Sequence, residues 1–257
     1  MSYLSELIDS TRDRIGAAKA TTSAGALEQR IAGGRPPLGF TASLGGSSIS
    51  LIGEIKRASP TAGDLNRALS ASGMAAAYAD GGAAALSVLT EPERFLGSLD
   101  DLEAALGAGL PVLRKDFILD DWQLLESRAA GADAVLLIVR ALGGDLGGFL
   151  DATAALGMAA LVEVHDAGEL ALATEAGATL VGVNHRDLAT FEVDPDRTAK
   201  LAALKPEGTT LVALSGVSTR AEVEELEGAG ADAVLVGEAL VTAQDPVAKV
   251  RELLGQA

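Results

Sequence analysis

Short runs of apolar residues recur along most of this chain, with glycine-rich or polar segments between them. Eight runs begin about 20 to 33 residues apart, which is room for one strand, one helix and two connections. They cover residues 51–55, 84–89, 111–113, 134–139, 159–164, 179–183, 210–214 and 233–236. The runs are nearly continuous in aliphatic residues, which is typical of parallel strands buried on both faces.

Helical patterns fill the intervals between these runs. They cover residues 68–79, 99–107, 121–130, 147–156, 168–175, 195–203 and 220–228. Glycine often follows such a pattern just before the next apolar run, as in Gly131-Ala-Asp133 and Gly230-Ala-Asp232, and glycine supplies the left-handed turn that ends a helix. Eight such units predict an α/β protein with a (β/α)8 TIM-barrel fold. The alternative is an open doubly wound sheet, which rarely has eight evenly spaced parallel strands.

The first 48 residues precede this repeating pattern of strands and helices. Residues 3–20 predict an amphipathic helix with Leu4, Leu7, Ile8 and Ile15 on one face, and residues 26–31 predict a second, shorter helix. We therefore expect one domain over residues 1–257, in which residues 1–48 form an N-terminal helical extension of the barrel.

Ionisable residues gather where the apolar runs end. Glu54 and Lys56 lie two residues apart, so their side chains share one face of the first strand. A salt bridge at an ordinary strand end would explain that pair alone. However, Lys115, Glu163 and Arg186 follow other strands, and the carboxyl ends of barrel strands carry the active site in barrel enzymes. We therefore predict an enzyme, with the alternative that these charges only pair with one another along the rim.

These residue types suit acid–base chemistry on a small anionic molecule. Lysines that are desolvated or close to other cations have lowered pKa values and can donate protons, whereas a glutamate beside an apolar pocket can have a raised pKa and act as base. Ser215-Gly216 and Gly237-Glu238 follow the last two strands, where backbone N–H groups of many barrels hold a phosphate.

Composition narrows the range of partners. The formal charge of −16 disfavours nucleic acid and anionic membranes, and the chain has no cysteine. Two histidines without ligand spacing argue against a metal site, and no glycine-rich dinucleotide motif follows the first strand, so we expect no cofactor. The N-terminus lacks the features of a signal peptide and no run suits a membrane span, so we expect a cytoplasmic protein. We expect a monomer, with a homodimer as the alternative.

Longer motifs in the chain resemble those of a known family, the indole-3-glycerol phosphate synthases. The resemblance covers nearly the whole chain. Its marks, in order, are Glu54-Ile-Lys-Arg-Ala-Ser-Pro60, Ser87-Val-Leu-Thr90 with Phe95 and Gly97-Ser98, Pro111-Val-Leu-Arg-Lys-Asp-Phe-Ile118, Gly131-Ala-Asp-Ala-Val-Leu-Leu-Ile138, Leu161-Val-Glu-Val-His165, Asn184-His-Arg-Asp-Leu188 with Thr190-Phe191, and Val236-Gly-Glu238.

The resemblance implies a lyase of tryptophan biosynthesis, which closes 1-(2-carboxyphenylamino)-1-deoxyribulose 5-phosphate into indole-3-glycerol phosphate and releases carbon dioxide and water. It implies that Lys115 is the general acid, that Glu163 assists dehydration, and that Lys56 contacts the substrate and is a second proton donor. Glu54 and Asn184 would hold the lysines and the substrate. The implied substrate-binding residues are Ser59, Phe95, Phe117, Leu136, Arg186, Leu188, Ser215, Gly216, Val236, Gly237 and Glu238. Among these, Phe95, Phe117, Leu136, Leu188 and Val236 would form an apolar slot for the anthranilate ring.

Two positions depart from the family pattern. The family normally has Ser-Glu-Ser-Gly at the end of strand 7, whereas this chain has Ala213-Leu-Ser-Gly216, so Leu214 replaces an active-site glutamate. We expect that replacement to reduce turnover or alter the substrate, without loss of the fold, and to lower the lysine pKa values further. His185 replaces a small polar residue and should be tolerated. The alternatives are a related phosphate-binding isomerase, which the absence of cysteine disfavours, and a paralogue that binds ligand without turnover. Residues 57–63 are expected to form a loop that closes over substrate.

Overall fold

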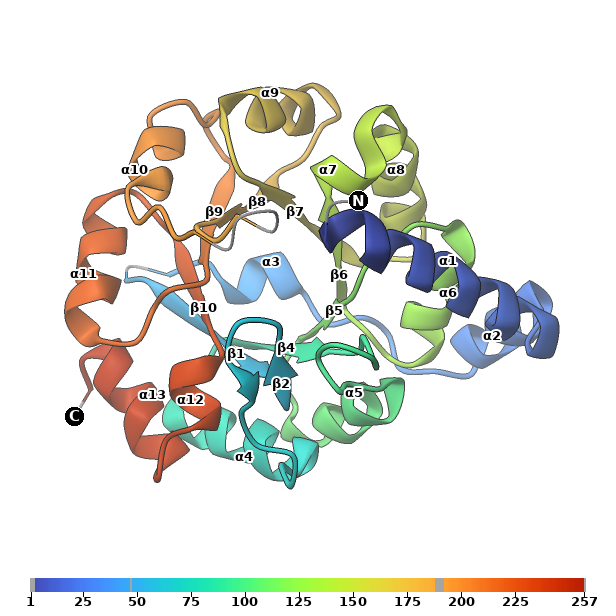
Figure 1. Cartoon of the computed structure of the whole chain (residues 1–257), viewed down its shortest axis with the longest axis horizontal. Coiled ribbons are helices and arrows are strands. Elements are labelled where there is room, and N and C mark those ends of the chain that lie inside the picture. Colours follow the sequence, from blue (N-terminus) through green and yellow to red (C-terminus); the bar gives the residue numbers. More distant parts are fainter. Residues whose placement is uncertain (1–2, 47, 188–191, 257) are drawn as a thin grey trace.

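Eight parallel strands close into a barrel with helices around it, as the sequence predicted (Figure 1). The structure is a computed structural model that describes residues 3–46, 48–187 and 192–256. The barrel strands are β1 (Ser50–Ile55), β4 (Ala85–Leu89), β5 (Val112–Lys115), β6 (Ala134–Ile138), β7 (Ala159–Val164), β8 (Leu180–Asn184), β9 (Thr210–Leu214) and β10 (Ala233–Val236). Each neighbours its predecessor in the chain and β10 pairs with β1, so the doubly wound alternative is wrong.

Alternate residues of each strand divide between two cores. Ile52, Leu113 and Leu235 belong to a cluster inside the barrel, whereas Leu51 and Val236 belong to the larger cluster between strands and helices. This alternation follows from the two-residue period of a strand. It also carries Glu54 and Lys56 onto the inward face that begins at Ile52.

Seven outer helices follow the predicted order, with boundaries shifted by a few residues, and the sequence did not predict an eighth, α13 (Pro246–Leu254). The seven are α4 (Ala71–Gly81), α5 (Leu99–Ala105), α6 (Asp121–Ala129), α8 (Leu146–Ala155), α9 (Ala167–Glu175), α10 (Arg197–Ala202) and α11 (Arg220–Gly228). Short helical turns add α7 (Val139–Leu142), α12 (Glu238–Val241), η1 (Leu106–Ala108) and η2 (Gly143–Asp145). Within the described parts of the chain, none of the helices is both long and apolar enough to cross a membrane.

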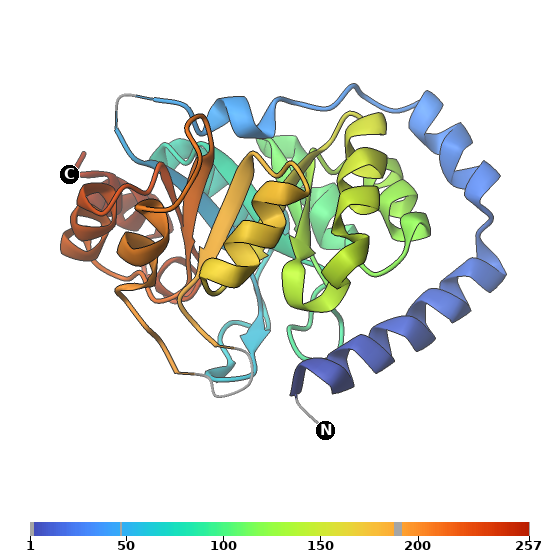
Figure 2. The same ribbon diagram turned by 90° about the horizontal axis from the view of Figure 1, so that it is seen from above.

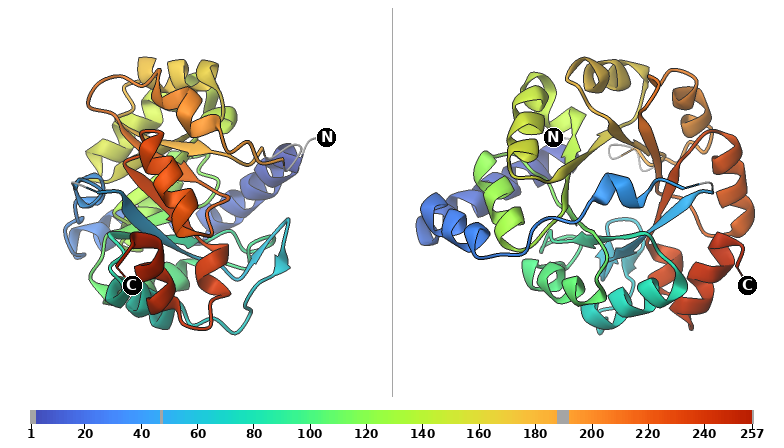
Figure 3. Two further views of the ribbon diagram at one scale, coloured as in Figure 1. Left: turned by 90° about the vertical axis from the view of Figure 1, so that its left-hand side faces the viewer. Right: turned by 180° about the vertical axis from the view of Figure 1, so that it is seen from behind.

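The N-terminal extension wraps one side of the barrel. Helix α1 (Tyr3–Thr21) begins near the carboxyl ends of the strands, and α2 (Ala24–Ala32) packs against α6 (Figure 2). The chain then crosses the opposite end of the barrel, where α3 (Phe40–Ser43) lies over the opening (Figure 3, right). Phe40 is buried in the interior cluster, so α3 closes that end. The sequence predicted α1 and α2 but not α3.

The segment after β1 is more ordered than the loop expected from residues 57–63. Two short strands, β2 (Ala58–Ser59) and β3 (Gly63–Asp64), pair antiparallel beside the barrel mouth (Figure 1). Arg57 anchors the base of this hairpin, since its guanidinium donates to both carboxylate oxygens of Asp101 and to the backbone oxygens of Leu96 and Leu69. The mouth is therefore bordered by a braced hairpin.

Candidate active site

Two adjoining cavities open at the carboxyl ends of the strands. The larger has a volume of about 500 Å³ and the smaller about 50 Å³. Phe95, Lys115 and Asn184 line both, so they stand where the two meet. The larger cavity is rich in polar groups, whereas the smaller is mostly apolar. A molecule with one polar and one flat apolar part would fit across them.

Three charged side chains meet on the inward faces of β1 and β5. The Lys56 Nζ lies 3.0 Å from Oε2 of Glu54, and the Lys115 Nζ lies 3.5 Å from Oε1 of the same carboxylate. Burial by itself would raise the pKa of Glu54, but Lys56 and Lys115 outweigh it and hold that pKa below its ordinary value. Glu54 is therefore a carboxylate that holds two lysines in place.

The expectation of lowered lysine pKa values is wrong for Lys115. Burial does lower its pKa, but the carboxylates of Glu54 and Glu163 outweigh burial, and the pKa is raised above its ordinary value. Lys115 is thus a fully charged ammonium at neutral pH. Such a group is a hydrogen-bond and proton donor to a substrate oxygen that gains negative charge.

Glu163 and Asn184 stand on the other side of the barrel mouth. Both are buried, and the Asn184 Nδ2 donates a hydrogen bond of 3.1 Å to Oε1 of Glu163. The Asn184 Oδ1 accepts from the backbone N–H of Arg186, which fixes the amide orientation. Glu54, Lys56, Lys115 and Asn184 line the larger cavity, and Glu163 lines the smaller one.

The smaller cavity brings together three of the residues predicted for the apolar slot. Phe95, Phe117 and Leu136 line it as expected, together with Leu89 and Ile138, which the sequence reading missed. Val236 does not contribute, because it packs in the cluster between the barrel and its helices, and its neighbour Leu235 faces the larger cavity instead. Side chains two residues apart on a strand share a face, so the position two residues before Gly237 would have identified Leu235 as the cavity-facing residue. Leu188 lies outside the described residues.

The far end of the larger cavity is lined by turns after β9 and β10. Ser215 and Gly216 have φ values of +70° and +83°, so two successive residues are left-handed there. Ser59 and Thr61 of the hairpin, Arg186, and Gly237 with Glu238 complete this end. Glu238 is exposed, and its carboxylate would repel an anion, so only its backbone suits the predicted phosphate contact. All the other described residues predicted for phosphate binding lie together.

Gly237 is needed because no side chain fits beside Glu54. A Cβ on Gly237 would lie 2.4 Å from Oε2 of Glu54 and 3.0 Å from Nζ of Lys56. We expect Gly237→Ala to displace this ion pair and to lower kcat/KM by roughly 100-fold, since misplacement of about 1 Å has effects of that size. Gly148→Ala in α8 is the matched control, because its Cβ would meet nothing within 4 Å. Equal kcat/KM for the two variants would contradict this role for Gly237.

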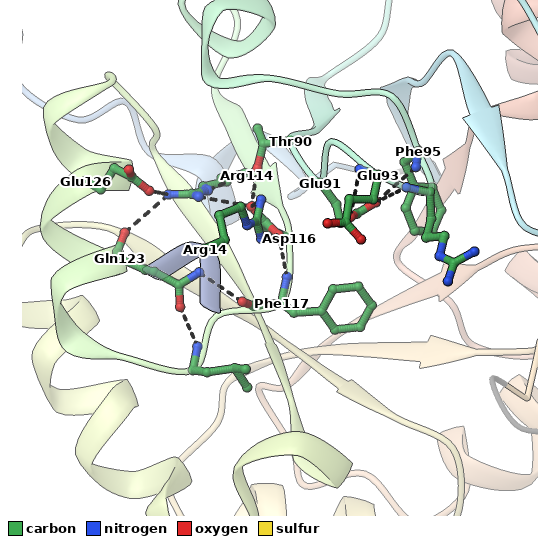
Figure 4. Close-up of polar contacts among 12 residues, drawn as sticks. Arg14, Thr90, Glu91, Glu93, Phe95, Arg114, Asp116, Phe117, Gln123 and Glu126 are labelled. Atoms are coloured by element: carbon green, nitrogen blue, oxygen red, sulfur yellow. Dashed lines mark hydrogen bonds and ion pairs between the residues drawn. The ribbon is translucent and has the colours of Figure 1, made fainter. Parts of the chain in front are cut away.

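A buried ionic network centres on Asp116 and was not foreseen from the sequence (Figure 4). The fully buried Asp116 carboxylate accepts from Arg14 of α1 at 2.7 Å, from Arg114 at 3.0 Å and from the Thr90 hydroxyl at 2.7 Å. Arg114 and Arg14 outweigh burial and hold the pKa of Asp116 below its ordinary value. Because Asp116 directly follows Lys115, the network braces the backbone that carries this lysine.

Glu91 holds the loop that places Phe95 (Figure 4). Its buried carboxylate accepts three backbone N–H groups, from Glu93, Arg94 and Phe95, at 3.0, 2.7 and 3.0 Å. The tight turn that results directs Phe95 toward the junction of the two cavities. The sequence signal was Glu91-Pro-Glu at a strand end, but it does not reveal which N–H groups the carboxylate would meet.

The arrangement offers proton donors and acceptors instead of metal ligands. Among residues 3–46, 48–187 and 192–256, no group of three or more histidine or acidic side chains is placed to hold a metal ion. The charged residues that line the two cavities are two lysines, one arginine and five carboxylates.

Comparison with known proteins gives strong matches over the full length. A family model described as indole-3-glycerol phosphate synthase matches residues 4–253. An indole-3-glycerol phosphate synthase of Parafrankia sp. (strain EAN1pec) is 48% identical over 256 residues, which is 99% of this chain and 96% of that protein. A protein of the same name from Mycobacterium avium (strain 104) is 47% identical over 255 residues, 98% of this chain and 94% of that protein.

Solved structures match in fold alone. Thiamine phosphate pyrophosphorylase from Pyrococcus furiosus has a TM-score of 0.58 at 16% identity, covering 80% of this chain and 93% of that one. Orotidine 5'-phosphate decarboxylase from Pyrococcus horikoshii OT3 has a TM-score of 0.59 at 18% identity, covering 72% and 91%. Both matches support the barrel architecture.

Proposed function

Because the chain belongs to the indole-3-glycerol phosphate synthase family, we propose that it closes the indole ring of indole-3-glycerol phosphate, as a carboxy-lyase of tryptophan biosynthesis. The substrate would be 1-(2-carboxyphenylamino)-1-deoxyribulose 5-phosphate. The observation that carries the proposal is the position of Lys115, between a polar cavity and an apolar slot and opposite Glu163. A phosphorylated sugar chain suits the first space and an aromatic ring suits the second.

We propose that binding separates the substrate's two ends. The phosphate would lie against the turns at Ser215-Gly216 and Gly237, with Arg186 and Lys56 supplying positive charge. The aromatic ring would lie between Phe95, Phe117 and Leu136. This places the ketose carbon near Lys115, where both spaces meet. Backbone donors would allow a chain of net charge −16 to bind a phosphate with few basic residues.

The chemistry then divides between two acids and one base. Lys115, charged at neutral pH, would protonate the ketose oxygen while the aromatic carbon bearing the carboxylate attacks the ketose carbon. Carbon dioxide leaves and the ring becomes a hydroxylated pyrroline. Lys56 would protonate the departing hydroxyl, and Glu163 would accept the proton lost when the indole forms. Glu54 and Asn184 position these groups without exchanging protons with substrate.

The direct test is formation of indole fluorescence from the carboxyphenylamino substrate by the purified chain. We expect turnover with release of one carbon dioxide per indole. A dephosphorylated substrate should bind far more weakly, since it lacks the anion for the Ser215 end of the cavity. Binding of the full substrate without indole formation would instead favour a paralogue without turnover.

Leu214 is the one observation that favours low activity. It is buried inside the barrel, next to Asn184 on β8 and Leu235 on β10 in the strand register, and both neighbours line the cavities. A carboxylate there could accept a hydrogen bond from the substrate or a lysine, which is worth about 1.5–3 kcal/mol. We therefore expect Leu214→Glu to raise kcat/KM by roughly tenfold or more. Leu214→Gln, which lacks the charge, is the control. An unchanged kcat/KM in Leu214→Glu would contradict the expectation that Leu214 lowers activity.

We also propose that the chain works as a monomer in the cytoplasm. The two cavities open at the carboxyl ends of the strands of a single closed barrel, which supports a site contained within one chain. Light scattering during turnover tests the oligomeric state, and a dimer whose dissociation abolishes activity would contradict a functional monomer.

A further inference from the structure

One buried ring nitrogen beside the proposed base has no hydrogen-bond partner among the described residues. It is the Nε2 of His165, whose side chain is completely buried. His165 follows β7 two residues after Glu163, so the two side chains share the inward face, and Nε2 lies 3.6 Å from Oε1 of Glu163. Buried polar atoms are nearly always paired, so this one needs a physical reason.

The other side of the ring is held firmly by Glu169 of α9. The Oε2 of Glu169 lies 3.1 Å from Nδ1 of His165 and accepts the His165 backbone N–H at 2.8 Å. Its second oxygen accepts from the Arg140 guanidinium. The Arg140 guanidinium and the His165 backbone N–H therefore both donate to this carboxylate. Glu169 is thus an ionised acceptor, and Nδ1 of His165 must carry the hydrogen.

The fixed tautomer determines what Nε2 presents to Glu163. A neutral ring with hydrogen on Nδ1 has a bare lone pair on Nε2. A charged ring would pair with the carboxylate at about 2.7–2.9 Å, which is shorter than the 3.6 Å found here. Lone pair and carboxylate repel each other while Glu163 is ionised. Once Glu163 gains a proton, the same geometry gives an O–H···N hydrogen bond.

We propose that His165 is a positioning residue for Glu163, one that accepts a hydrogen bond from the Glu163 carboxyl as soon as that group takes a proton from the substrate. The inference rests on the base role proposed above for Glu163. The proton passes from a substrate atom to Oε1, where it is shared with Nε2, and returns to solvent or product by the same atom. The Glu169–Arg140 pair stays ionised throughout.

Other charges also face this pair and must be kept constant in any test. Lys115 of β5 acts on Glu163 from the cavity side. On the Glu169 side, Arg140 is 2.9 Å from Asp187 and 3.9 Å from Asp166. Substitution of His165 alone leaves all of these in place, so a change in pH dependence can be assigned to the ring.

The first test does not depend on turnover. The chain has two histidines, His165 and His185, so ¹⁵N ring spectra are simple, and a His185→Asn variant assigns them. We expect the His165 ring at neutral pH to carry hydrogen on Nδ1 and none on Nε2. A ring protonated on Nε2, or on both nitrogens, would overturn the proposal whether or not the chain forms indole.

The second test uses the pH dependence of the reaction. His165→Asn keeps an N–H donor for Glu169 and removes the group that faces Glu163. We expect kcat to fall by at least about tenfold with little change in KM. The acid limb of the kcat/KM profile should move to lower pH, because the protonated form of Glu163 loses its acceptor.

His185→Asn is the matched control, since its ring bonds Thr198 at 2.6 Å and not Glu163. We expect its acid limb to remain in place. If the acid limb of the kcat/KM profile does not move in His165→Asn, His165 only packs against its neighbours. If the acid limb moves to higher pH, the ring is a cation. Either result overturns the proposal. A native chain that forms no indole would refute the proposed function instead, and the ring spectra would still decide the tautomer.

Discussion

Lys115→Ala is expected to abolish most indole formation while the protein remains folded. The substitution removes the ammonium that lies 3.5 Å from Glu54 at the junction of the two cavities. General acid catalysis contributes about 10²–10⁴-fold, so we expect kcat to fall by roughly 10³-fold. Because the phosphate end of the cavity is untouched, KM should change much less. Stopped-flow indole fluorescence measures both quantities.

Lys249→Ala provides the control for loss of a lysine. Lys249 lies in α13 and pairs with Glu252 on the same helix, away from the cavities. Its variant should keep native kcat and KM, because exposed pairs of this kind are worth little. A Lys115→Ala protein that retains more than a tenth of native kcat would show that another group is the general acid, with Lys56 the first to examine.

Asp116→Ala is expected to have the largest effect on stability. The fully buried carboxylate neutralises Arg114, whose side chain is 3% exposed, and Arg14, which is 30% exposed. Removal of one partner from a buried ion pair costs about 3–5 kcal/mol. Here Arg14 loses its carboxylate partner, whereas Arg114 keeps Glu126 at 2.8 Å. For a chain of this size that cost corresponds to a decrease in Tm of roughly 6–20 °C. Calorimetry with denaturant unfolding measures both.

Two further measurements separate charge from packing at this site. Arg14→Ala should cost less than Asp116→Ala, since Asp116 keeps Arg114 and Thr90 as partners. The pKa of Asp116 is lowered in the folded chain, so its ionisation stabilises the fold above the unfolded pKa of about 3.9, and this contribution is lost as the pH falls toward the folded pKa. The stability difference between native and Asp116→Asn proteins should therefore shrink below about pH 4. A difference that stays constant across that range would contradict an electrostatic role.

Local sequence determined the barrel and most of the candidate site. Each strand was visible as an apolar run because both its faces are buried, and the helices between them gave the unit length. The two-residue period placed Glu54 with Lys56, and the end of each run placed Lys115 and Glu163 at one rim. These inferences needed only neighbours along the chain, which is why the sequence contains them.

The protonation of the site was decided by distances between strands. Burial alone would have lowered the pKa of Lys115, and the carboxylates of Glu54 and Glu163, on β1 and β7, reversed the sign. The tautomer of His165 likewise depends on Glu169, whose reach to the ring is set by the turn between β7 and α9. The Arg14–Asp116 contact joins residues 102 positions apart.

The extension shows the same division between sequence and tertiary structure. Its amphipathic pattern predicted α1, because one helix face repeats every three to four residues. Only the packed structure showed that α1 delivers Arg14 to the carboxylate beside Lys115, and that α3 closes the far end of the barrel. Sequence determined the elements and the chemistry available to them, because periodicity and residue type are local. Tertiary structure decided which charges meet, because electrostatic energy depends on separations that the chain order does not specify.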